Sequence, residues 1–135
     1  MGAGRPVAET YFILNSRGVP VIELDPRTWA LWYDADPRRH VLHTAWETED
    51  GMAEVDTCFT GFDLRPRAER ENDGLPQLWD TVASLYPMHT RAEEPETLGI
   101  WRWETEDDAR KGHEQVVHEI QMEWGGGVPG GNGKA

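Results

Sequence analysis

The segment that follows Thr105 constrains the fold more than any other part of the chain. Its apolar residues recur at helical spacing and form one stripe: Ala109, His113, Val116, Val117, Ile120 and Trp124. Thr105 is an N-cap candidate with Asp108 placed as in a capping box, and the acidic first turn suits the helix dipole. A helix with one apolar stripe buries it against another layer. The sequence therefore predicts a C-terminal helix on a sheet, with His113 buried and hydrogen-bonded between them.

Strand patterns supply that sheet. Two apolar runs around Asn15–Gly18 predict a hairpin, and Asp25-Pro26 predicts the start of a short helix near residue 30 that carries Trp29, Trp32 and Tyr33 on one face. Further strands are expected over 39–46, 53–62, 78–86 and 99–103, with a hairpin turn at 49–51 and loops over 64–77 and 87–98. The fold class is α+β: an antiparallel sheet of about four to six strands with the C-terminal helix on one face.

Length and charge limit the domain organisation and the partners. A chain of 135 residues is sufficient for one domain, expected over 1–124, and the glycine-rich run 125–135 is expected to be a flexible tail. The net charge of −12 opposes binding to nucleic acid, which needs a concentrated basic face. No apolar run has membrane-spanning length and no signal peptide is evident, so a cytoplasmic protein without a membrane partner is expected. The single cysteine, Cys58, fits a small buried residue in a strand.

Three segments resemble a family of small, uncharacterised proteins of bacteriophages and prophages, especially those of actinobacteria. The family's first strand, V-S-T-V-F-L-G-L-D-H, is similar to this chain at Val55, Thr57, Phe59, Gly61 and Asp63. Its second strand, L-F-E-T-M-V-F, corresponds to Leu78, Asp80 and Thr81. Its R-Y strand and T-W-E-E-A-x-x-G-H helix correspond to Arg102, Trp103, Thr105, Ala109, Gly112 and His113. The resemblance covers most of residues 20–118 and implies the fold and a phage setting, but no activity.

The chain departs from the family pattern at three positions. Leu64 replaces the family's histidine after the strand aspartate, Asp80 replaces its glutamate, and Glu106 replaces its tryptophan after the cap threonine. The loss of the histidine removes one residue from any metal or acid–base site in this region.

Asp63, Asp80 and His113 are the candidates for such chemistry. Two carboxylates and an imidazole have the right composition for a metal site or an acid–base pair. The structural alternatives are a loop cap for Asp63, a solvent-facing strand position for Asp80 and a core histidine for His113. These alternatives are favoured, so no metal and no cofactor is predicted. No nucleophile elbow or phosphate-binding loop accompanies these residues.

Aromatic residues are the other candidate for a binding site. The chain has seven tryptophans, and Trp101-Arg102-Trp103 offers stacking faces beside a guanidinium group. This segment predicts a contact with a planar ligand or a peptide. The alternative is that the tryptophans replace leucines in the core.

These features favour a binder over an enzyme. The first hypothesis is a non-enzymatic phage or prophage accessory protein that binds a host protein or a second copy of itself, with a counter-defence role, in the host cytoplasm. The second is a protein that sequesters a nucleotide-like small molecule. The third is a metal-dependent hydrolase that uses Asp63, Asp80 and His113.

Overall fold

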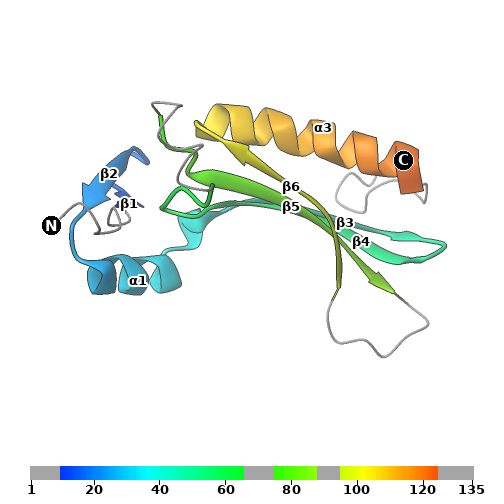
Figure 1. Cartoon of the computed structure of the whole chain (residues 1–135), viewed down its shortest axis with the longest axis horizontal. Helices are drawn as coiled ribbons and strands as arrows, with labels where there is room; N and C mark the ends of the chain where they lie inside the picture. The colour runs from blue at the N-terminus through cyan, green and yellow to red at the C-terminus, as the bar shows by residue number, and fades with distance from the viewer. Residues whose placement is uncertain (1–9, 66–74, 88–94, 125–135) are drawn as a thin grey trace, which may run out of the picture.

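The sheet and the long helix form two layers. The structure is a computed structural model, and it describes residues 10–65, 75–87 and 95–124. Four antiparallel strands are ordered β3-β4-β5-β6, with bounds β3 His40–Thr48, β4 Gly51–Phe59, β5 Trp79–Pro87 and β6 Glu96–Trp103. Helix α3, Glu106–Trp124, runs along one face of this sheet (Figure 1). The predicted α+β architecture is confirmed.

The N-terminal elements lie at one end of the sheet. Strands β1 (Tyr11–Leu14) and β2 (Pro20–Glu23) form a separate two-stranded sheet, and α1 (Pro26–Ala35) follows them. Asp25 caps α1 by accepting a hydrogen bond from the Arg27 amide at 2.9 Å. A short 3-10 helix, η2 (Pro37–Arg39), connects α1 to β3. In Figure 1, α1 lies on the side of the sheet opposite to α3.

The predicted helix stripe is the core. The side chains of Ala109, His113, Val116, Val117 and Ile120 are all buried. The C-terminal half of the stripe packs on a cluster of sheet residues: Trp46, Ala53, Val55, Ala83 and Leu85. The predicted cap is also present, because the Thr105 hydroxyl accepts the Asp108 amide at 3.0 Å.

A second cluster attaches the N-terminal elements to the end of the sheet. Its buried members are Leu14, Phe59, Leu78, Trp79 and Ala109. Trp32 of α1 contacts Phe59 edge to face, with ring centroids 5.7 Å apart. The backbone at Gly61 packs closely against α1 and requires glycine. Its φ is +84°, and a Cβ there would lie 2.2 Å from the Trp29 indole nitrogen.

Three strand predictions need correction, and the first is that β4 ends at Phe59 rather than at residue 62. β6 begins at Glu96 rather than at residue 99, because a bulge opposite Ala83 and Ser84 lets residues 96–98 continue the ladder. A second irregularity in β3, between His40 and Leu42, shifts the register by one residue. His40 therefore faces Cys58, on the same side of the sheet as His43, instead of alternating with it.

Other predictions concern segments outside the described residues. The tail at 125–135 lies outside them, as do 66–74 and 88–94 of the two predicted loops. Among the residues that the structure describes, no helix combines the length and apolar character needed to cross a membrane.

Candidate functional site

The sheet face that points away from α3 carries polar and charged side chains that have no part in the core. We call it the open face. In the register of the four strands it consists of four rows: His40–Cys58–Asp80–Arg102, His43–Asp56–Val82–Ile100, Ala45–Glu54–Ser84–Thr97 and Glu47–Met52–Tyr86. Neighbours within a row have Cβ atoms about 5 Å apart, so side chains in adjacent strands contact one another.

His43, Glu54 and Asp56 form the most compact polar group on the open face. His43 Nδ1 lies 2.5 Å from Asp56 Oδ1, and the ligand atoms of all three residues lie within 4.8 Å of one another. The hydrogen bond to Asp56 raises the pKa of His43, and the charges of Asp56 and Glu54 add to this effect. The group is accessible, since the side chains of His43 and Asp56 are 56% and 45% exposed.

A cavity opens beside this group. It has a volume of about 480 Å³ and is lined by His40, Val41, Leu42, His43 and Asp56. The bulge in β3 places these residues around one hollow, because it turns His40 to the side of the sheet where His43 lies.

Cys58 lies beside the cavity in the first row. Its sulfur is 3.9 Å from His40 Nδ1. Burial raises the pKa of the Cys58 thiol, and the neighbouring carboxylates of Asp56 and Asp80 raise it further. A thiol of this kind is mostly protonated at neutral pH, so the pair does not have the character of an activated nucleophile.

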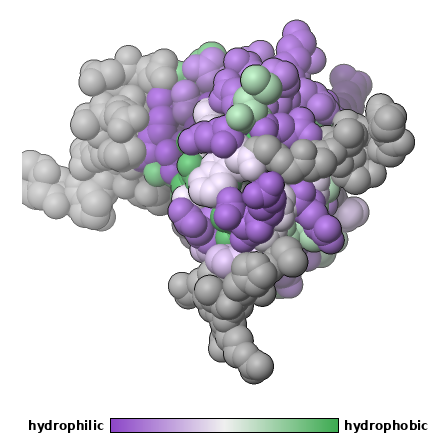
Figure 2. Space-filling model, turned by 90° about the vertical axis from the view of Figure 1, so that its right-hand side faces the viewer, coloured by the Kyte–Doolittle hydropathy of each residue, from purple (hydrophilic) through white to green (hydrophobic). Residues whose placement is uncertain are grey.

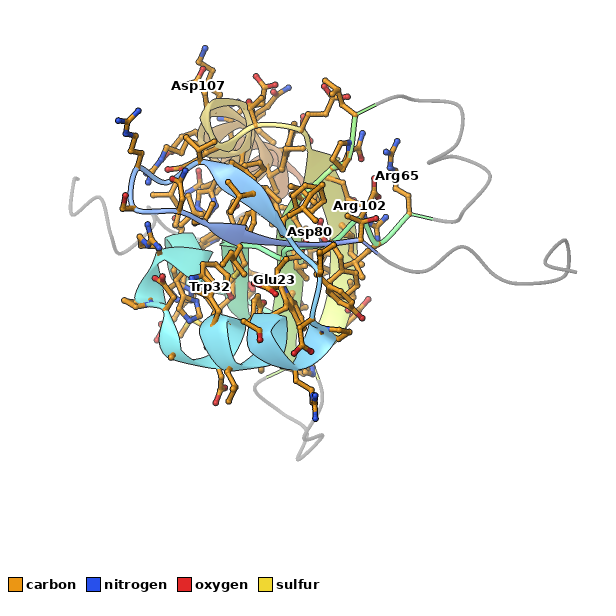
Figure 3. All side chains as sticks on the ribbon, turned by 90° about the vertical axis from the view of Figure 1, so that its left-hand side faces the viewer. Glu23, Trp32, Arg65, Asp80, Arg102 and Asp107 are labelled. Atoms are coloured by element: carbon orange, nitrogen blue, oxygen red, sulfur yellow. The ribbon has the colours of Figure 1, made fainter. Side chains whose placement is uncertain are left out.

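The first row ends with the buried Asp80 and the half-buried Arg102, which form a loosely bound pair. Arg102 Nε lies 3.7 Å from Asp80 Oδ2, and neither Arg102 Nε nor Asp80 Oδ1 has a hydrogen-bond partner. Burial raises the pKa of Asp80 to about 6, which Arg102 opposes and Asp63 reinforces. The two side chains lie next to each other, near Arg65, at the end of the sheet seen in Figure 3.

Asp63 has a structural role near the same end. Its carboxylate accepts hydrogen bonds from the Arg65 side chain, with Nη2 to Oδ2 at 2.6 Å, and from the Gln77 amide at 3.0 Å. Burial works to raise the pKa of Asp63, but these hydrogen bonds outweigh it and lower the pKa. This pair holds the ends of the segment between β4 and β5, as the loop-cap alternative for Asp63 predicted.

His113 lies on the other side of the sheet. Its side chain is 0% exposed, with Nδ1 2.8 Å from the Thr57 hydroxyl and Nε2 2.9 Å from the Thr44 hydroxyl. The structure therefore brings Asp63 and Asp80 to one end of the sheet but separates both from His113. The prediction that His113 is a buried, hydrogen-bonded histidine is confirmed.

Three hydroxyl groups and one indole N–H form a hydrogen-bond chain around His113. Trp103 Nε1 can only donate, and it donates to Thr81 Oγ1 at 2.9 Å. The Thr81 hydroxyl lies 2.6 Å from the Thr57 hydroxyl, which in turn lies 2.8 Å from His113 Nδ1. A neutral ring donates from one nitrogen and accepts at the other, so both hydroxyl contacts of His113 are satisfied. Burial lowers the pKa of His113, in agreement with a neutral ring.

The predicted aromatic segment is divided between the two faces. Trp101 packs against the cluster under α3 and Trp103 against the cluster at the end of the sheet, whereas Arg102 belongs to the open face. The core alternative describes these two tryptophans better than a shared stacking surface does.

Sequence reasoning missed the His43, Glu54 and Asp56 group, although a signal for it was present. A two-residue turn at Glu49-Asp50 pairs Thr48 with Gly51, and the same register places His43 opposite Asp56. Period-2 alternation then places Glu54 on the same face as Asp56. His40 could not be found in this way, because the bulge breaks the alternation.

Comparison with known proteins adds no relative: no family model, no curated protein and no solved structure matches the chain.

Proposed function

We propose that the chain is a non-enzymatic accessory protein of a bacteriophage or prophage, and that its open face binds a basic surface of a host protein. The phage setting rests on the sequence resemblance described above. The binding role rests on one observation, which is that α3 covers only one face of the sheet and α1 lies at one end of the other (Figure 1).

The open face has the composition of an interface. Ile100 and Tyr86 are 49% and 40% exposed, and they lie in rows that also contain Val82 and Met52. An exposed apolar patch with a polar rim is typical of a protein-binding surface. Glu47 stands in the row of Tyr86, and Glu54 stands in the row between this row and that of Ile100, so both supply an acidic border.

Charge selects the kind of partner. The chain has a net charge of −12, and the end of the molecule shown in Figure 2 is mostly hydrophilic, with small apolar areas. Two copies with this charge repel each other, whereas a basic partner is attracted and steered to the acidic border. A basic host protein therefore fits the open face better than a second copy of the chain.

A photo-crosslinking amino acid at position 100 tests this proposal in host cells. The control places it at Met122, which is 75% exposed on α3. The expected result is one basic host protein crosslinked from position 100 and not from position 122. Recovery of the same proteins from both positions, or of a second copy of the chain, would overturn the proposal.

The purified partner then allows a quantitative test. Ile100→Arg is expected to weaken its binding by about tenfold or more, because the substitution removes apolar contact and adds a repelled charge. Met122→Arg is expected to leave the affinity unchanged, and higher NaCl concentration is expected to weaken it. Equal effects of the two substitutions would show that the open face is not the contact.

A further inference from the structure

The strongest unassigned chemistry in the described chain is the group formed by His43, Glu54 and Asp56. It lies on the open face near the edge of the sheet, because β3 is an edge strand. Its position does not depend on any partner, and the inference drawn from it goes beyond the proposed function.

The sheet fixes all three side chains in place. His43 and Asp56 are direct cross-strand partners, so the strand pairing itself holds their Cβ atoms close together. Glu54 lies two residues before Asp56 on β4 and opposite Ala45, whose short side chain leaves space above the sheet. Ligands on paired strands are held more precisely than ligands on loops.

We propose that His43, Glu54 and Asp56 bind one divalent first-row transition-metal ion. The ligand atoms lie within 4.8 Å of one another. Neighbouring ligands that bind one ion at about 2.1 Å, at octahedral or tetrahedral angles, lie about 3.0–3.4 Å apart. The widest pair therefore has to close by up to about 1.5 Å, which rotation of the partly exposed side chains can supply, and the 2.5 Å pair of His43 and Asp56 has to open by about 0.5–1 Å.

The local charge supports a cation. Among the described residues, Asp56 pairs only with His43, and no Lys or Arg side chain neutralises Glu54 or Asp56. The two carboxylates offset the charge of a divalent ion at this point, and the imidazole of His43 is available to it as a neutral ligand.

The cavity completes the site. His43 and Asp56 belong to its lining, and its volume of about 480 Å³ leaves room for water or a small ligand on the open side of an ion. One imidazole nitrogen with two carboxylates is a mixed N/O set, which suits Mn²⁺, Fe²⁺, Co²⁺, Ni²⁺ and Zn²⁺ better than Ca²⁺ or Mg²⁺.

The test uses the tag-free chain with Co²⁺, Zn²⁺ and Mg²⁺ in calorimetry near pH 7.5, with the visible absorption of Co²⁺ as a second signal. The expected result is one Co²⁺ or Zn²⁺ ion per chain and much weaker binding of Mg²⁺. His43→Ala and Asp56→Asn are each expected to weaken Co²⁺ binding by about tenfold or more. Far-UV circular dichroism checks that each variant is folded.

Two control variants separate this site from general binding to an acidic surface. Glu47→Gln removes another carboxylate of the open face, and His118→Ala removes an exposed histidine of α3. Both are expected to bind Co²⁺ like the natural chain. Absence of saturable binding up to about 1 mM Co²⁺, or equal weakening in the controls, would overturn the site, since protein sites of this kind bind far below that concentration.

The outcome is independent of the proposed partner. Ile100→Arg leaves the three ligands intact, so the variant is expected to keep its Co²⁺ affinity even where it loses the host protein. A chain that binds a basic partner but no ion would refute only the metal site.

Discussion

At the scale of single residues, the buried polar chain around His113 decides which part of the candidate chemistry is structural. His113 touches two hydroxyl groups from two strands, and Thr57 in turn contacts Thr81. A histidine whose two ring nitrogens are both occupied, with 0% exposure, has neither a free lone pair nor a path to a substrate. Its role is to satisfy hydroxyl groups that the sheet would otherwise bury without partners.

His113→Leu is expected to lower the free energy of unfolding by about 2–4 kcal/mol, because it leaves buried hydroxyl groups without a partner. His118→Leu, on the exposed side of the same helix, is the control and is expected to change stability by less than about 0.5 kcal/mol. Urea denaturation followed by circular dichroism measures both. Similar values for the two variants would contradict the hydrogen-bonding role of His113.

At the scale of secondary-structure elements, α3 approaches β6 closely because position 112 has no side chain. A Cβ on Gly112 would lie 2.2 Å from Cζ2 and 2.3 Å from Cη2 of Trp103. The absence of a side chain lets the indole reach Thr81 and donate its hydrogen bond. Two consecutive residues of α3 therefore make two different contacts. Gly112 leaves room for the ring of Trp103, and His113 contacts the threonine hydroxyl groups below it.

Gly112→Ala is expected to destabilise the domain by about 1–3 kcal/mol, although alanine favours a helix over glycine by about 1 kcal/mol, because the clash is with a packed ring. Adding Trp103→Phe should recover part of the loss, since the smaller ring leaves room for the methyl group. Thermal and urea unfolding of the single and double variants measure this coupling. A stabilised Gly112→Ala protein would show that Trp103 lies elsewhere.

The secondary-structure elements show which parts of the fold can be predicted from the sequence. The helix stripe, the Thr105 cap and the Asp25-Pro26 helix start are local patterns, and each was predicted correctly. The start of β6 and the facing of His40 depend on bulges, which arise from pairing between strands and leave no local pattern. The candidate residues at Asp63, Asp80 and His113 had suitable chemistry, but the face on which each residue lies depends on the sheet as a whole.

At the scale of the whole molecule, two buried carboxylates have opposite effects on stability at neutral pH. Ionised Asp63 favours the folded state, and ionised Asp80 opposes it. Hydrogen bonds from Arg65 lower the pKa of Asp63, whereas burial raises that of Asp80 to about 6. The surroundings of Asp80 are Arg102, Asp63, Cys58 and Tyr33, of which only Arg102 carries a positive charge. Ionised Asp80 therefore lowers the free energy of unfolding at neutral pH, and the size of this effect depends on pH.

Asp80→Asn isolates this contribution. Because the folded pKa is above the usual 3.8, the folded state holds a proton that the unfolded state releases between about pH 4 and pH 6. The stabilisation that protonated Asp80 gives is present below pH 4 and lost as pH rises through 6, by up to about 3 kcal/mol. The unfolding free energy of the variant minus that of the natural chain should increase over this window. A difference independent of pH would contradict the raised pKa.

The single thiol of the chain can report the detachment of the N-terminal elements from the sheet. Cys58 is half-buried in the row of the open face nearest α1, and burial raises the pKa of the Tyr33 phenol, to which Cys58 adds. Tyr33 of α1 lies near this thiol, so a motion that lifts α1 away from the sheet is expected to expose the only cysteine of the 135 residues more fully. The rate at which a disulfide reagent labels the natural chain, without any engineered residue, reports how often its N-terminal elements detach.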